Sequence, residues 1–153
     1  MSYFLLENYI KLVLKEKVNA KIKLNIFDFD HTLYNPEKKF WLKDICQKVE
    51  ESLSSQNTIT ILCTARHKDL KEETINMLEE KFPKEFDDYL FNTEEESRAI
   101  YKSKAIKSFL KENPDITHIE FWDDKKDNLN AVKEIIKKEY PQIKIKTNLV
   151  KEA

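Results

Sequence analysis

Two aspartates, Asp28 and Asp30, stand one residue apart at the end of an apolar segment, NIFDFDHTLY (25–34). The Ile and Phe residues predict a buried strand, and a buried carboxylate without a partner is energetically costly. One aspartate in this place could simply cap the next turn. Two of them this close together indicate a site that binds a cation.

Two other apolar segments also end in polar side chains. The segment TITILCTAR ends in Thr64 and Arg66, and the segment HIEFWDDKKDN contains Asp123 and Asp124, followed by Asp127. Taken singly, Thr64, Asp124 and Asp127 could be helix caps, because threonine and aspartate are common in that role. Their recurrence at the ends of predicted strands favours a shared site.

The elements that must position these groups follow from the periodicity of apolar residues. Apolar segments predict strands over 21–29, 58–64, 88–92, 116–122 and 143–150, and helical spacing predicts helices over 4–16, 38–53, 68–82, 103–113 and 126–140. In the helix over 38–53, Phe40, Ile45, Val49 and Leu53 form the predicted inner side. Alternating strands and helices predict an α/β fold with a doubly wound parallel sheet, which binds ligands at the carboxyl ends of its strands. Carboxylates gathered at that edge suit a hard cation with oxygen ligands, such as Mg²⁺.

Length and composition set the domain organisation. The 153 residues are used up by five strand–helix units, which leaves no room for a cap domain over the site. We therefore expect one domain over residues 1–153, in which 1–18 form an N-terminal helical extension. The net charge of −1 indicates no particular partner, and glycine is absent, so every tight turn must use another residue.

The cysteines and the apolar segments bear on the compartment. Cys46 and Cys63 are too few for a disulfide framework. The start of the chain lacks a signal-peptide pattern, and no apolar run reaches the length of a membrane span. We expect a soluble, cytoplasmic protein with no membrane partner, and the sequence makes no prediction of its oligomeric state.

Four motifs in the order of a known superfamily extend over residues 21–130. They are DFDHT, TILCTAR, a lysine within YKSKAIKSFL, and FWDDKKDN. In this order they resemble the haloacid dehalogenase (HAD) superfamily of phosphotransferases, in its capless form with a Rossmann-like core.

This resemblance implies a role for each motif. Asp28 would attack phosphorus and form an aspartyl-phosphate, and Asp30 would act as general acid and then as general base. Mg²⁺ would be held by Asp28, the backbone carbonyl of Asp30, and Asp123. Thr64 and the lysine would bind the phosphate oxygens.

The lysine of the third motif has two candidates. Lys102 is favoured, because apolar residues lie three, four and seven positions beyond it, as in the family; Lys104 is the alternative. Residues expected beside the reacting groups are Thr32, Asp124, Asp127 and Arg66. His31 and Trp41 are candidates for substrate contact, although Trp41 could instead be a core residue. The family often has glycine where His31 and Ala65 stand.

A weaker resemblance, carried by FDFDHTL, Pro36, Trp41 and FDDYLFN, is to the phosphatase domains of polynucleotide kinase/phosphatases and related RNA-repair proteins. It implies a phosphorylated substrate such as a DNA or RNA end. A small-molecule phosphatase or nucleotidase is the alternative, and a non-catalytic interaction module of the same fold is another. A phospho-accepting receiver domain does not fit, because its acceptor aspartate would end the third strand, which here ends in LFNT.

Overall fold

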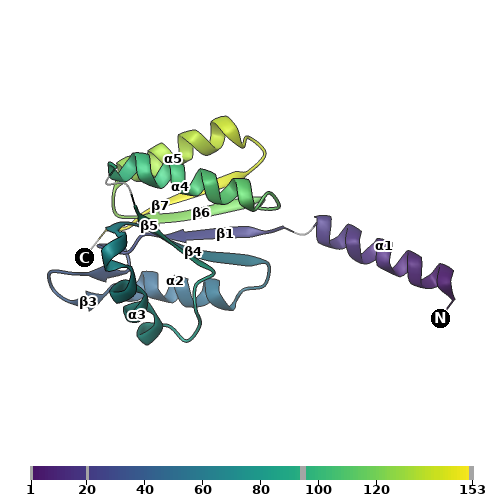
Figure 1. The fold of residues 1–153 in the computed structure, drawn as a ribbon, viewed down its shortest axis with the longest axis horizontal. Coiled ribbons are helices and arrows are strands. Elements are labelled where there is room, and N and C mark those ends of the chain that lie inside the picture. The colour runs from purple at the N-terminus through teal and green to yellow at the C-terminus, as the bar shows by residue number, and fades with distance from the viewer. Residues whose placement is uncertain (1, 20, 94–95, 152–153) are drawn as a thin grey trace.

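The computed structural model describes residues 2–19, 21–93 and 96–151, and its centre is a sheet of five parallel strands (Figure 1). Their order is β5-β4-β1-β6-β7. The strands are β1 (Lys23–Phe27), β4 (Thr58–His67), β5 (Asp88–Asn92), β6 (His118–Asp123) and β7 (Lys144–Leu149). The predicted doubly wound parallel sheet is confirmed.

Helices cover both faces of this sheet (Figure 1). The helices α4 (Arg98–Glu112) and α5 (Lys126–Glu139) pack on one face, against Ile26 and its neighbours. The helices α2 (Lys43–Ser54) and α3 (Lys71–Lys81) pack on the other face, against Phe27. The 3₁₀ turn η1 (Lys68–Leu70) leads into α3. Successive residues of β1 point to opposite faces, so Leu24 and Ile26 enter one core and Phe27 enters the other.

The register of the three central strands aligns the polar groups that follow them. Phe27 of β1 pairs with Leu62 of β4 and with Trp122 of β6. The backbone N–H of Asp28 donates to the carbonyl oxygen of Trp122 at 3.0 Å, so Asp28 stands level with Asp123. The convergence expected at the carboxyl edge therefore takes place.

The predicted helix over 38–53 is wrong in its first turn. Residues 34–41 form a small antiparallel hairpin of β2 (Tyr34–Asn35) and β3 (Phe40–Trp41), and α2 begins only at Lys43. The Asn35 side chain accepts from the backbone N–H of Lys38 at 2.9 Å and so stabilises the turn. Phe40, predicted to face the core from a helix, is 42% exposed. Within the described residues, this hairpin is all that separates β1 from α2, and no cap domain stands there.

Helix α1 (Tyr3–Asn19) lies where a helix was predicted and extends away from the sheet (Figure 1). Its described apolar side chains are exposed: Tyr3, Phe4, Leu5, Leu6, Tyr9, Ile10 and Leu12. None of the helices in the described part of the chain combines the length and the apolar character needed to cross a membrane.

Candidate active site

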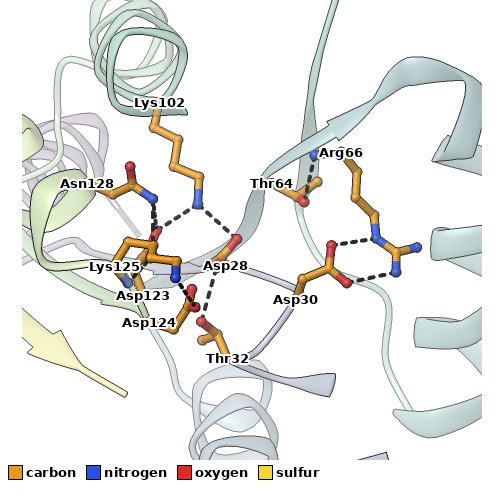
Figure 2. A network of polar contacts seen from close by, with 10 residues as sticks. All are labelled: Asp28, Asp30, Thr32, Thr64, Arg66, Lys102, Asp123, Asp124, Lys125 and Asn128. Atoms are coloured by element: carbon orange, nitrogen blue, oxygen red, sulfur yellow. Dashed lines mark hydrogen bonds and ion pairs between the residues drawn. The ribbon is translucent and has the colours of Figure 1, made fainter. Parts of the chain in front are cut away.

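Asp28, Lys102 and Asp123 form a buried ionic network at the carboxyl edge of the sheet (Figure 2). Lys102 Nζ lies 2.8 Å from Asp28 Oδ1 and 2.6 Å from Asp123 Oδ2. Asp28 follows β1, Asp123 ends β6, and Lys102 reaches the two carboxylates from α4. The three side chains are at most 8% exposed, so water screens their interaction little.

Burial and the neighbouring charges both shift the pKa values of this network. Burial raises the pKa of Asp28, and the nearby Lys102 only partly offsets that rise. Burial and the charge of Asp28 likewise raise the pKa of Asp123. Burial by itself lowers the pKa of Lys102, but the two carboxylates outweigh it and raise the pKa, so the ammonium stays charged. One lysine therefore does not fully compensate two buried carboxylates.

A third carboxylate completes a set that could hold a metal ion. One oxygen from each of Asp28, Asp123 and Asp124 lies within 4.8 Å of the others. Three carboxylates with an uncompensated negative charge match a hard divalent cation with oxygen ligands. The metal set predicted from sequence was Asp28, the backbone carbonyl of Asp30, and Asp123, with Asp124 beside it as a further candidate. The donor set fits a cation.

Hydrogen bonds hold the two buried carboxylates in place. Thr32 Oγ1 donates to Asp28 Oδ2 at 3.1 Å. Asp123 Oδ1 accepts from the backbone N–H of Lys125 at 2.9 Å, and Asn128 Nδ2 lies 3.2 Å from both Asp123 oxygens. Both carboxylates are thus oriented before any ligand arrives.

Asn128 is a site residue that sequence reasoning missed. It is 3% exposed and reaches Asp123 from the first turn of α5. The acidic neighbour Asp127, which was expected beside the site, is exposed on that turn. The signal for Asn128 lies in the motif FWDDKKDN, where this amide directly follows Asp127.

Asp30 and Arg66 form a separate pair, apart from the network of Asp28, Lys102 and Asp123 (Figure 2). Arg66 Nε and Nη2 donate to the two oxygens of Asp30, each at 2.8 Å. The guanidinium also lies 4.5 Å above the Phe29 ring and donates to Thr74. Asp30 is 33% exposed, so this pair faces solvent far more than the buried network does.

Thr64 ends the core of β4 beside this pair. Its side chain is buried, and its Oγ1 accepts from the backbone N–H of Arg66 at 3.1 Å. Thr64 lines a cavity of about 490 Å³ together with Asp28, Asp30 and Lys102. The hydroxyl therefore borders the same space as the buried carboxylate.

The two residues expected to contact substrate differ in position. His31 lines the cavity, and its Nε2 lies 3.3 Å from Glu37 Oε2. Its φ of 60° is in the left-handed region that glycine adopts without cost, which explains why the family often has glycine there. Trp41 instead packs among Phe29, Tyr34 and Phe82, with ring centroids 5.0 to 6.0 Å away, and takes no part in the cavity wall.

The two candidate lysines also differ in position. Lys102 is 1% exposed within the acidic network. The side chain of Lys104 is 64% exposed and pairs with Glu96 at 2.6 Å. The structure therefore places Lys102, and not Lys104, beside Asp28.

Two cationic residues in the cavity wall were not singled out from sequence. Arg98 is the first residue of α4, and Lys125 precedes α5. The predicted helix over 103–113 began five residues too late to include Arg98.

Comparisons with known proteins identify the family of this chain. Residues 13–152 match the family model described as HAD domain family 1 in Swiss Army Knife RNA repair proteins. Among solved structures, one chain of the structure of the Pnkp1/Rnl/Hen1 complex is similar, with a TM-score of 0.61 and 15% identity. The similarity covers 88% of this chain but only 48% of that one. Comparison with curated proteins gives no match. The chain belongs to this HAD family.

Proposed function

From this family membership we propose that the protein is a Mg²⁺-dependent phosphomonoester hydrolase that works through an aspartyl-phosphate on Asp28. One observation carries the proposal: Asp28 is held by Lys102 and Thr32 at the floor of a cavity, beside two further carboxylates. Residues of the HAD family that do this chemistry stand at the same motif positions in this sequence.

Asp28 is the nucleophile in this proposal. An oxygen of Asp28 forms a bond to phosphorus, and the bond from phosphorus to the leaving oxygen breaks. Lys102 and Thr32 each bind one oxygen of the carboxylate, which fixes its direction before substrate arrives. This orientation removes much of the entropic cost of attack.

Asp30 handles the proton in both halves of the reaction. It gives a proton to the leaving oxygen, and it then takes one from the water that attacks the aspartyl-phosphate. Attack by that water releases inorganic phosphate and restores the Asp28 carboxylate. Asp30 must first separate from Arg66, and a substrate phosphate in the cavity offers Arg66 another anion with matching geometry.

The remaining residues bind the phosphoryl group or the metal. Thr64 Oγ1 and Lys102 Nζ border the cavity and supply donors to phosphate oxygens. Asp28, Asp123 and Asp124 would hold Mg²⁺, with the backbone carbonyl of Asp30 as a further ligand from the family pattern. Bound there, Mg²⁺ would neutralise charge that develops on the phosphoryl oxygens.

The substrate we propose is a phosphate at the end of a nucleic-acid strand. The description of the family, which places it in RNA repair proteins, supports this choice. The absence of a cap domain between β1 and α2 among the described residues supports it too, because a long strand could reach the cavity.

One panel tests the proposal. Purified protein is assayed with and without Mg²⁺ against p-nitrophenyl phosphate, mononucleotides, sugar phosphates, and oligonucleotides phosphorylated at the 5′ or 3′ end. We expect Mg²⁺-dependent release of phosphate, with a higher kcat/KM for the oligonucleotides. Preference for mononucleotides would favour a nucleotidase, and no Mg²⁺-dependent release from any substrate would favour a non-catalytic module.

A further inference from the structure

Arginine is scarce in this chain, and both arginines border the same cavity. The 27 basic residues include only Arg66 and Arg98, and the others are lysine. Arg66 and Arg98 both line the cavity that contains Asp28. A guanidinium differs from an ammonium in presenting a planar fork of donors that matches phosphate oxygens in pairs. The use of arginine at both positions points to a role that lysine fills less well.

The two arginines differ in what they already bind. Arg66 is engaged with both oxygens of Asp30. Lys102 is engaged with Asp28 and Asp123, and Lys125 Nζ lies 3.8 Å from Asp124. Arg98 is exposed and has no ion pair or hydrogen bond from its side chain to residues 2–19, 21–93 or 96–151. Among the described cations of the cavity, Arg98 is therefore the one left for an anion that a ligand brings.

The position of Arg98 on α4 indicates which anion that is. Arg98 precedes Lys102 by four residues, so the two side chains share one face of the helix, about 6 Å apart along its axis. Lys102 marks the place of the reacting phosphate beside Asp28. One helical turn is of the same order as the separation of neighbouring phosphates in an extended nucleic-acid strand.

We propose that Arg98 binds the phosphodiester next to the terminal phosphate and thereby selects strand ends over mononucleotides. The inference rests on the proposed phosphatase function and adds to it a specificity-determining residue. A mononucleotide has no second phosphate, so it leaves Arg98 without a partner. A strand end provides that phosphate, and the fork of Arg98 binds it with two charge-assisted hydrogen bonds.

The test compares Arg98→Ala and Arg98→Lys with the matched control Lys111→Ala, which removes an exposed lysine from the last turn of the same helix. The substrates are p-nitrophenyl phosphate, a terminally phosphorylated RNA oligonucleotide, and the same oligonucleotide with a neutral methylphosphonate in place of the phosphodiester next to the end. We expect Arg98→Ala to lower kcat/KM for the ordinary oligonucleotide about 10- to 100-fold relative to p-nitrophenyl phosphate. Arg98→Lys should recover part of this loss, and Lys111→Ala should behave as wild type.

The methylphosphonate substrate identifies the partner of Arg98. For the wild type, the methylphosphonate should lower kcat/KM by the same factor as Arg98→Ala does on the ordinary oligonucleotide. For Arg98→Ala, the methylphosphonate should lower kcat/KM little further. The inference is overturned if Arg98→Ala lowers kcat/KM equally for p-nitrophenyl phosphate and for the oligonucleotide, or lowers it for neither.

A binding measurement separates failure of this inference from failure of the proposed function. Fluorescence anisotropy with a labelled, terminally phosphorylated oligonucleotide needs no turnover. Weaker binding by Arg98→Ala than by Lys111→Ala supports the inference even if the wild type hydrolyses nothing, an outcome that rejects the phosphatase proposal alone. Equal binding by the two variants, or no binding by the wild type, rejects the role of Arg98.

Discussion

The Asp28–Lys102–Asp123 network and the Asp30–Arg66 pair border one cavity, but solvent reaches them to different degrees. The side chains of the network are exposed by 8% or less, whereas Asp30 and Arg66 are exposed by 33% and 14%. The network places one cation against two carboxylates. The outer pair matches one guanidinium with one carboxylate through two hydrogen bonds.

This difference in exposure suits the two groups of residues to different kinds of chemistry. The buried network is held rigidly and lacks one positive charge, which suits a nucleophile that works beside a metal ion. The outer pair is balanced by itself and close to water, so it can open without leaving a buried charge alone. A group that must give and take protons is better placed in the outer pair.

The largest expected effect is that of Asp28→Asn on hydrolysis. The amide is a poor nucleophile, so we expect turnover to fall by roughly 10⁴-fold or more. The fold should persist, because the change leaves Lys102 facing one carboxylate instead of two. Steady-state assays with p-nitrophenyl phosphate and a thermal melt check both points. Turnover comparable to wild type would remove Asp28 from the mechanism.

Asp30→Asn should have a smaller effect that depends on the leaving group. We expect a loss of about 10² to 10⁴ in kcat/KM for alkyl phosphates, as is typical of general acid–base catalysis. The loss should be smaller for p-nitrophenyl phosphate, because nitrophenolate leaves without a proton. Comparison of the two substrates provides the measurement. An equal loss on both would mean that Asp30 acts in another way.

Lys102→Met should reveal the cost of an uncompensated buried charge. Removal of one partner from a buried ionic network typically lowers the free energy of unfolding by about 3 to 5 kcal/mol. The matched control is Lys104→Ala, which breaks an exposed pair with Glu96 and should cost about 1 kcal/mol or less. Urea unfolding followed by circular dichroism gives both values. Similar losses for the two variants would contradict the buried network.

Mg²⁺ should stabilise the wild type through the three carboxylates. At about one hundred times its dissociation constant, a ligand that binds only the folded state raises the free energy of unfolding by about 2.7 kcal/mol. Asp124→Asn should reduce this gain, whereas Asp127→Asn, an exposed neighbour, should not. Thermal melts of each variant with Mg²⁺ and with EDTA measure this stabilisation. Loss of the gain in Asp127→Asn alone would relocate the metal site.

Arg66→Lys should lower the free energy of unfolding much less than Lys102→Met does. The substitution keeps the charge but removes the paired hydrogen bonds to Asp30, and the pair is partly exposed, so we expect a cost of about 1 kcal/mol. Urea unfolding beside Lys102→Met checks the ranking. A cost for Arg66→Lys as large as that for Lys102→Met would show that the outer pair is not the loosely held one.

The order of strands and helices was predictable because each segment carries its own periodic pattern. The apolar residues of β1, β4 and β6 identify buried strands, and aspartate or threonine at their ends identifies the edge where they meet. The hairpin over 34–41 was not predictable in the same way. Phe40 and Trp41 suit a helix or a strand equally, and the turn between Asn35 and Lys39 decides between them. Lys39 adopts a φ of 56° in that turn. Glycine usually marks such a conformation in a sequence, and this chain has none.

The sequence by itself determined the fold class and the candidate acidic centre, because strand periodicity and motif order are local properties of the chain. Only the tertiary structure showed that Lys102 lies against Asp28, whereas Lys104, two residues further along the same helix, pairs with Glu96. It also put Asn128 rather than Asp127 against Asp123, kept Trp41 among other aromatic rings, and brought Arg98 to the cavity wall. Each of these outcomes depends on which face of an element meets which neighbour. Packing between segments far apart in the sequence sets which faces meet, so the type of a single residue does not determine it.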